Sequence, residues 1–214
     1  MIGILIPDRG DRPLFLEHCM HLMDKQTLQP DVMELMCDKP LNDMCDITYR
    51  YRIGCERLFK QGCDVILFIE NDDYYREDYI EKMILKWNEC NRPRIFGLGS
   101  TTYYHIGLRK YMRMVHSQRA SAFCTLVTPD IMDLSFGKDH EPFFDLHLWQ
   151  QNNISKATYE FSKIKALGIK HGVGKFGGKA HNKNFKYDKD DKDLSFLRSV
   201  VDDKSFEFYK NYML

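Results

Sequence analysis

The sequence predicts an α/β protein with a mostly parallel sheet flanked by helices. Within the first 90 residues, short apolar runs alternate three times with segments of helical periodicity, which is typical of parallel strands joined by helices. The 214 residues suffice for one sizeable domain with its own core. Hydrophobic residues make up 43% of the chain and charged residues 29%, as in ordinary globular proteins. Because no internal repeat or long linker divides the sequence, we expect a single domain over residues 1–214.

The first half contains three predicted strands, each followed by a predicted helix. Residues 2–6 form an apolar run that Pro7 stops, and Pro13 suits the first turn of a helix that ends near Gln26. Apolar side chains at helical spacing predict the second helix, with Gly62 where a C-cap would stand. The predicted strands cover residues 2–6, 31–38 and 64–69, and the predicted helices cover about 13–26, 47–61 and 76–90.

The pattern changes after Pro93, where the second half begins. Residues 103–119 mix aromatic and basic side chains without a clear period. Residues 163–189 carry eight lysines against one aspartate, together with several glycines. Pro142 stands near the start of a predicted helix, and Pro129 opens a shorter one. We expect strands at 94–100 and 120–128, and helices at 141–152, 193–201 and 204–214.

Charge, hydropathy and cysteine usage narrow the functional classes. The 31 basic and 31 acidic side chains cancel, so any binding of a polyanion would rest on a local patch. No apolar run approaches the roughly 18–20 residues of a membrane span, and the N-terminus lacks the features of a signal peptide. The seven cysteines form no C-x-x-C pair, which favours reduced thiols over a disulfide framework or a zinc site. Together these features predict a cytoplasmic protein.

Acidic side chains stand at the ends of all three predicted strands. Asp8 and Arg9 follow the first strand, Asp38 ends the second, and residues 70–73 (Glu-Asn-Asp-Asp) follow the third. The carboxyl ends of neighbouring parallel strands share one edge of a sheet, where ligands bind. Carboxylate oxygens are preferred ligands of Mg²⁺ and Mn²⁺, which also bind substrate phosphates. The sequence therefore predicts a divalent-metal site; the alternative is a solvated turn whose acids cap the next helix.

Two segments of the first half carry distinctive combinations of motifs. In IGILIPDRGDRPLFLEHCMHLMDKQTLQPDVMELMCD, a strand runs into proline and an arginine-containing turn, a helix ends near Gln-Thr, and a second strand ends in aspartate. In DVILFIENDDYYREDYIEKM, an apolar strand is followed by E-N-D-D and two aromatic residues. Both segments resemble glycosyltransferases of the GT-A fold, in the family-2-like group, whose D-x-D region is an apolar strand followed by D-x-D-D and two aromatic residues. Glu70 stands at the first acid and Asp72 at the second, so this chain has E-x-D, which would alter the metal geometry or preference. The resemblance covers about the first 90 residues.

The resemblance implies a nucleotide-diphosphate sugar as donor, bound with Mn²⁺ or Mg²⁺. Residues 1–92 would bind this donor, and residues 93–214 would bind the acceptor. Glu70 and Asp72 would hold the ion on the diphosphate, where its charge assists the departing nucleoside diphosphate. The implied donor contacts, of which Asp8, Arg9 and Asp38 would meet the base and ribose, are Pro7, Asp8, Arg9, Arg12, Asp38 and Asn71. From the residues alone, turn chemistry explains Asp8 and Asp38 equally well.

An inverting transferase also needs a carboxylate that accepts a proton from the acceptor hydroxyl. In the family this is an aspartate at the start of a helix well after the D-x-D region, and the segment HEPFFDLHLWQQ offers Asp145 in that setting. Glu141 is the competing candidate. Alternatively, Asp145 is a first-turn residue that the helix dipole favours.

The glycine-rich segment 170–182 is the last candidate binding element. It contains G-x-G-x-x-G, but late in the chain and not after the first strand, so we favour a flexible loop over a dinucleotide site. Backbone N–H groups of that loop would meet phosphates together with Lys175 and Lys179. Related transferases supply a late histidine to the metal, which makes His171 or His181 a candidate ligand. We prefer His171 because it follows an apolar run, although a lone histidine is more often structural or exposed.

The predicted function is metal-dependent, inverting glycosyl transfer to an acceptor hydroxyl. The acceptor would be a saccharide, or an anionic molecule such as modified DNA bound along Tyr103, Tyr104, Arg109 and Arg113. One alternative is a nucleotidyltransferase of related fold that uses the same metal. The other is a non-enzymatic nucleic-acid-binding module that uses the two basic segments.

Overall fold

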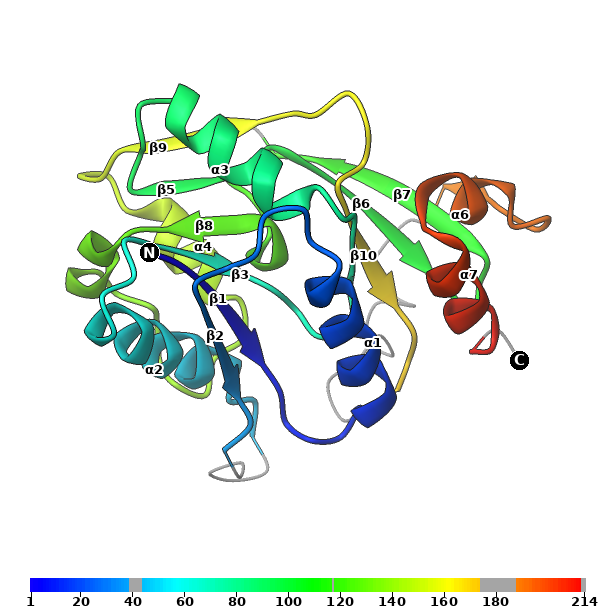
Figure 1. Ribbon diagram of the computed structural model, residues 1–214, viewed down its shortest axis with the longest axis horizontal. Coiled ribbons are helices and arrows are strands. Elements are labelled where there is room, and N and C mark those ends of the chain that lie inside the picture. Colours follow the sequence, from blue (N-terminus) through cyan, green and yellow to red (C-terminus); the bar gives the residue numbers. More distant parts are fainter. Residues whose placement is uncertain (39–43, 117, 174–187, 213–214) are drawn as a thin grey trace.

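The computed structural model of the chain describes residues 1–38, 44–116, 118–173 and 188–212. Within these ranges the central feature is a six-stranded sheet in the order β2-β1-β3-β8-β5-β9 (Figure 1). β8 runs antiparallel to both of its neighbours, and every other pairing in this sheet is parallel. The strands are β1 (Ile2–Pro7), β2 (Val32–Met36), β3 (Val65–Phe68), β5 (Ile95–Leu98), β8 (Thr125–Val127) and β9 (Lys156–Tyr159).

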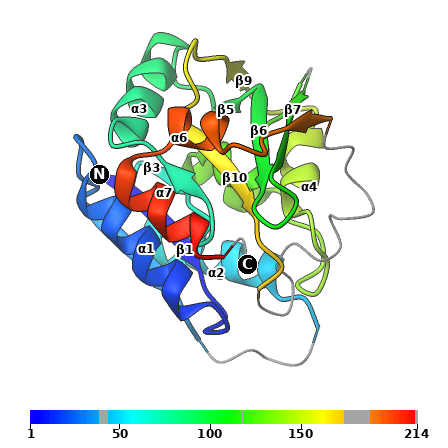
Figure 2. The ribbon, with the colours of Figure 1, turned by 90° about the vertical axis from the view of Figure 1, so that its right-hand side faces the viewer.

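A five-stranded sheet in the order β11-β7-β6-β10-β4 lies beside the first (Figure 2). β6 and β10 are parallel and the other pairings are antiparallel. The chain enters this sheet directly after β3, because residues 69–73 connect β3 of one sheet to β4 of the other. Its strands are β4 (Tyr74–Tyr75), β6 (Ser100–His105), β7 (Lys110–Val115), β10 (Ala166–Lys170) and β11 (Lys189–Asp190).

Helices cover both faces of the six-stranded sheet, and the pleat of its strands divides the core in two (Figure 1). Ile4 and Ile6 of β1 pack in the cluster that includes α1, α3 and the second sheet, whereas Leu5 packs in the cluster that includes α2 and α4. Gly54 allows α2 to lie close to β1, since a Cβ there would stand 2.2 Å from Leu5 Cδ1. The helices are α1 (Pro13–Asp24), α2 (Ile47–Lys60), α3 (Tyr79–Glu89), α4 (Phe144–Gln150), α6 (Ser195–Val200) and α7 (Asp203–Lys210), with 3₁₀ turns at Ala122–Cys124 and Pro129–Asp133.

The predicted fold class is confirmed, and the first-half strands and helices are present at nearly the predicted positions. The second half differs. Residues 103–119, for which no element was predicted, contribute to an antiparallel hairpin of β6 and β7. In β7 the apolar Val115 is exposed like the charged Arg113, so the residues of this strand do not follow a simple pattern of apolar side chains inside and polar ones outside. Residues 120–128 are not one strand, because a 3₁₀ turn precedes the short β8. No helix of the described ranges is long and apolar enough to cross a membrane.

Aromatic contacts join the last helix to α1 and to the end of β10. The Phe15 ring of α1 lies 4.2 Å from the His171 ring and 5.2 Å from the Phe208 ring of α7. His18, one turn further along α1, stacks on Phe208 at 4.2 Å with an interplanar angle of 13°. Burial lowers the pKa of His18 to about 4, although nearby Asp202 acts in the opposite direction. The neutral imidazole is therefore part of the packing that holds α7 on α1.

Acid should weaken this packing through His18. Its pKa falls from the ordinary 6.5 to about 4 on folding, so between these values the unfolded chain binds more protons, and the free energy of unfolding decreases as the pH falls. We expect His18→Phe, which keeps an aromatic ring, to lose less stability than the wild type between pH 6.5 and 4.5. Urea denaturation at several pH values measures this, with the exposed His140→Gln as control. Equal acid dependence in wild type and His18→Phe would contradict the assignment.

Candidate active site

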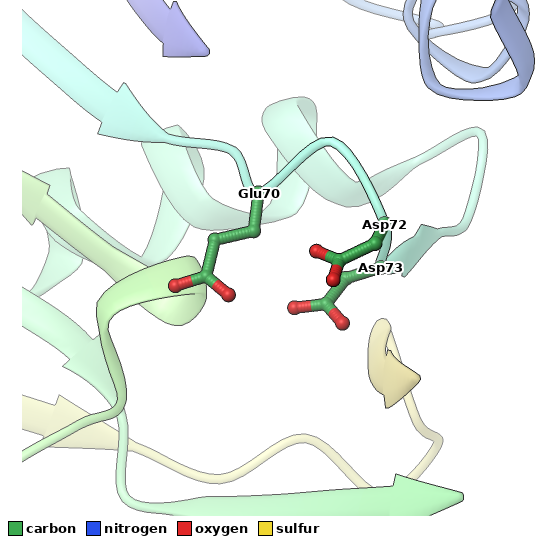
Figure 3. Close-up of side chains that lie close together, drawn as sticks. All are labelled: Glu70, Asp72 and Asp73. Atoms are coloured by element: carbon green, nitrogen blue, oxygen red, sulfur yellow. The ribbon is translucent and has the colours of Figure 1, made fainter. Parts of the chain in front are cut away.

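Three carboxylates converge on one space where the chain leaves β3. Ligand oxygens of Glu70, Asp72 and Asp73 all lie within 4.8 Å of one another. Figure 3 shows the three side chains extending from one turn with their carboxylate groups facing each other. We call these three residues the acid cluster. Glu70 and Asp72, the two acids expected to hold a metal ion, thus lie close together, with Asp73 beside them.

Contacts from both sheets hold this turn in place. On the side of the six-stranded sheet, the Ile69 N–H donates to the Leu5 carbonyl at 3.0 Å. On the side of the five-stranded sheet, the Ile169 N–H of β10 donates to Asp73 Oδ1 at 2.7 Å. Tyr75, in β4, places its hydroxyl oxygen 2.8 Å from the Glu70 N–H. The acid cluster is therefore built on rigid elements rather than on a free loop.

Two buried oxygens at this turn have no hydrogen-bond partner among the described residues. They are Asp73 Oδ2 and Asn71 Oδ1, and both side chains are only 1% exposed. The Asn71 amide nitrogen donates to Asp8 Oδ1 at 2.6 Å, and Asp8 Oδ2 accepts the Gly10 N–H at 3.1 Å. A buried oxygen without a donor carries a free-energy cost that a cation or a ligand donor would remove. These two atoms therefore point to a ligand at the end of β3.

Asp72 Oδ2 already has two partners. It pairs with Arg12 Nη1 and lies 2.8 Å from His171 Nε2. His171 Nδ1 accepts the Val173 N–H at 2.9 Å, so the ring proton belongs on Nε2, which donates to Asp72. In this arrangement His171 orients Asp72 rather than offering a lone pair to an ion. A role for His171 as metal ligand would require the other tautomer and the loss of the Val173 bond.

The positive charges near the acid cluster, Lys170 among them, offset only part of the burial and repulsion that act on Glu70 and Asp73. Burial and the neighbouring Asp72 raise the pKa of Glu70 to about 7, and the same two causes raise the pKa of Asp73 well above its usual value. Burial acts to raise the pKa of Asp72 as well, but Arg12 and His171 outweigh it and hold this pKa below its usual range. The donor set is all oxygen, two carboxyls are short of counter-charge, and one oxygen is unpartnered. The residues present thus fit a hard divalent cation.

Asp145 lies at the head of α4, buried close to the same site. Its Oδ2 is 3.5 Å from Arg119 Nη1. Burial raises the pKa of Asp145, with Arg119 opposing the shift, and the Asp145 charge in turn contributes to the raised pKa of Glu70. Phe143, two residues earlier, has a left-handed backbone (φ 65°) and is 63% exposed. A strained backbone conformation of this kind is often found at functional sites.

Glu141 is engaged in local structure instead. Its Oε2 accepts the Lys138 N–H at 3.1 Å and lies 3.6 Å from His147 Nε2. Its own carbonyl accepts the Thr48 hydroxyl of α2 at 2.6 Å. These contacts fix the approach to α4 and give Glu141 a structural role.

A second ionic group lies where β1 and β2 end. Asp46, directly before α2, pairs with Arg9 Nη1 at 2.5 Å and with Arg50 Nη2 at 2.8 Å. Arg50 is fully buried and also donates to the carbonyls of Met36 (2.6 Å) and Asp38 (2.9 Å). Sequence reasoning missed Asp46 and Arg50, although their i, i+4 spacing at the start of a predicted helix was a usable signal. It also missed Arg119, for which the sequence contains no signal.

The remaining candidates are placed as follows. The Asp38 carboxylate is about half exposed and pairs with Arg57 at 2.8 Å. Tyr103 and Tyr104 do not line a binding path, because both are buried, with their hydroxyls bonded to Ser121 (2.7 Å) and Asp191 (3.0 Å). Lys175, Lys179 and His181 lie outside the described residues.

Of the comparisons with known proteins, the one with solved structures gives matches. No family model matches the sequence, and no curated protein matches it significantly. Among solved structures, S. aureus TarS (residues 1–349) with UDP-GlcNAc matches at a TM-score of 0.57 and 10% identity, over 81% of this chain and 59% of that one. The same TarS region with UDP matches at 0.55 and 10% identity, over 78% and 60%. A197 from STIV matches at 0.48 and 13% identity, over 74% and 81%.

This chain thus spans about three fifths of the TarS region. At such identities the likeness concerns the fold. It confirms the predicted GT-A-like α/β fold.

Asp46 should be a strong determinant of stability. Asp46→Ala leaves the buried Arg50 guanidinium without its carboxylate, which we expect to cost about 3–5 kcal/mol of unfolding free energy. The matched control is Asp38→Ala, which breaks an exposed pair with Arg57 and should cost less than about 1 kcal/mol. Urea denaturation measures both, and losses of similar size would show that the Asp46 group does not anchor this region.

Proposed function

We propose that this chain, which has the GT-A-like fold of nucleotide-sugar transferases, is a metal-dependent, inverting glycosyltransferase. It would move a sugar from a nucleotide-diphosphate donor to an acceptor hydroxyl. The observation that carries the proposal is the acid cluster, three converging carboxylates with an unpartnered buried oxygen at the carboxyl end of a central strand. Residues 1–92 form the donor half and residues 93–214 the acceptor half in this proposal.

Glu70, Asp72 and Asp73 would hold a Mn²⁺ or Mg²⁺ ion. When bound, the ion supplies positive charge to the departing nucleoside diphosphate. His171 donates to Asp72 and fixes the direction of that carboxylate. Arg12, which directly precedes α1, would contact the diphosphate. Lys175 and Lys179 remain proposed phosphate contacts from the sequence.

The nucleoside would lie over the ends of β1 and β2. Asn71 and Asp8 form one connected pair there, and Asn71 Oδ1 is free to accept a hydrogen bond from the base or ribose. Arg9 is held by Asp46 next to this pair, and Pro7 ends β1 beneath it. Because Asp38 is tied through its carbonyl to Arg50, its carboxylate is kept near the same edge. The TarS structures contain UDP-GlcNAc or UDP, so UDP-sugars are the first donors to test.

Asp145 would accept the proton of the acceptor hydroxyl as the sugar carbon is attacked. Burial makes its carboxylate more basic, and Arg119 keeps it in the ionised form that a base requires. A base on the acceptor side of the donor corresponds to inversion of the anomeric carbon, which NMR of the product would reveal. Exposed Phe143 would give the acceptor an aromatic surface near the start of α4.

A saccharide acceptor is better supported than DNA. Two of the four side chains proposed for a nucleic-acid path, Tyr103 and Tyr104, are buried in the five-stranded sheet. A third, Arg113, pairs with Glu160 at 3.0 Å. The acceptor Michaelis constant should therefore depend little on salt, whereas phosphate contacts would give a steep dependence.

Removing the Asp72 charge should abolish transfer. With the donor identified by metal-dependent thermal stabilisation, Asp72→Asn should show no measurable turnover while it stays folded, because the carboxylate is needed for the ion. Excess EDTA should have the same effect on the wild type. The control is Glu160→Gln, an exposed acid outside the site, which should keep full activity.

The released product distinguishes the alternatives. Nucleoside diphosphate supports glycosyl transfer, and pyrophosphate would indicate a nucleotidyltransferase. Turnover that persists in EDTA would disprove the metal-dependent proposal. No turnover with any donor, combined with tight binding of nucleic acid that survives Asp72→Asn, would favour the binding module.

Asp145→Asn should separate chemistry from binding. The amide keeps the size of the carboxylate but cannot accept the proton, so we expect kcat to fall by roughly 10²–10⁴ with the donor Michaelis constant little changed. Glu141→Gln is the matched control, since Glu141 contacts Lys138 and His147 and should retain most activity. The reverse pattern would transfer the base role to Glu141.

A further inference from the structure

We propose that Arg12 acts as an internal cation that competes with the divalent metal for Asp72. The inference rests on the proposed function, because it concerns the metal site of that function. It adds that a side chain of the protein itself weakens the binding of a metal ion at this site. Metal binding would then release Arg12 from Asp72 and make its guanidinium available to the donor.

Arg12 directly precedes α1, and its side chain extends into the acid cluster. Its Nη1 pairs with Asp72 Oδ2, and the guanidinium is also under the influence of Glu70 and Asp73. The side chain is only 19% exposed, so solvent screens these interactions weakly. Arg12 thus occupies a position from which a cation is attracted by all three carboxylates.

Asp72 Oδ2, the oxygen that Arg12 contacts, already accepts as many hydrogen bonds as it has lone pairs. Asp72 Oδ2 receives both Arg12 Nη1 and the Nε2–H of His171, which accounts for its two lone pairs. An ion that uses this oxygen must displace one of the two donors. His171 is held by its own bond from Val173 and by the Phe15 ring, whereas Arg12 is a long, flexible side chain. Arg12 is therefore the partner that yields.

Arg12 alone does not satisfy the site. Asp73 Oδ2 stays without a partner at 1% exposure, so the cluster retains an oxygen for a second cation while Arg12 is in place. Once displaced, Arg12 still has Asp11, whose Oδ1 lies 3.7 Å from its Nε. It would remain at the rim of the site with its charge no longer neutralised by Asp72. Metal and donor diphosphate would then favour each other's binding.

Titration with Mn²⁺ alone tests the competition without any turnover. The proteins are the wild type, Arg12→Gln, Asp72→Asn and the double variant, and free Mn²⁺ is measured by electron paramagnetic resonance. We expect Arg12→Gln to bind Mn²⁺ at least about tenfold more tightly than the wild type, because a repelling charge and a competitor are both removed. In the Asp72→Asn background the same change should gain less than about threefold. Arg113→Gln removes an exposed positive charge elsewhere and should leave Mn²⁺ affinity unchanged.

Thermal melting provides a second measurement for a variant of reduced stability. Saturating Mn²⁺ should raise the melting temperature of Arg12→Gln by more than that of the wild type. If the wild type binds Mn²⁺ and Arg12→Gln binds it no more tightly, the competition is disproved and the metal site stands. A gain that persists undiminished in Asp72→Asn also disproves it. If neither protein binds Mn²⁺, both the competition and the proposed metal site fail.

Discussion

The hydrogen bond from the Ile169 N–H to Asp73 ties the turn after β3 to the second sheet, and the site depends on it. A carboxylate that is 1% exposed needs a donor, and β10 supplies one from its backbone. The other end of the turn is held by the Leu5 carbonyl of the first sheet. These two contacts fix both ends of the turn that carries Glu70, Asp72 and Asp73, whose ligand oxygens lie within 4.8 Å of one another.

This constraint explains the electrostatic character of the whole region. Buried like charges raise the pKa values of Glu70 and Asp73, and the surrounding elements offset only part of that cost. Arg12 from the start of α1 and His171 from the end of β10 both reach the same Asp72 oxygen. Acids that are held together without full neutralisation lower the free energy of unfolding. Such a loss of stability is typical of sites that bind a cation or a charged ligand.

The peripheral elements hold this centre in position. Phe15 links α7 to the His171 ring, so the C-terminal helix supports the side chain that orients Asp72. Asp46 and Arg50 join the ends of β1 and β2 to α2, which gives the nucleoside end of the proposed site a buried ionic anchor. On the acceptor side of the proposed site, Arg52 of α2 donates two hydrogen bonds to the Asp139 carboxylate, at 3.0 and 2.8 Å. These bonds restrain the segment that leads to Asp145. Three separate sets of contacts thus support the proposed site.

The sequence by itself determined the local features: β1–α1–β2–α2–β3–α3, the acids at strand ends, and Asp145 at a helix start. These follow from apolar periodicity and proline positions, which act over a few neighbouring residues. Only the tertiary structure decided that β6 and β7 form a hairpin, that Tyr103 and Tyr104 are buried, and that Arg12 and His171 meet at Asp72. The physical reason is range: Arg12 and His171 approach Asp72 across 60 and 99 residues of sequence, and only the packing of two sheets brings such distant residues together.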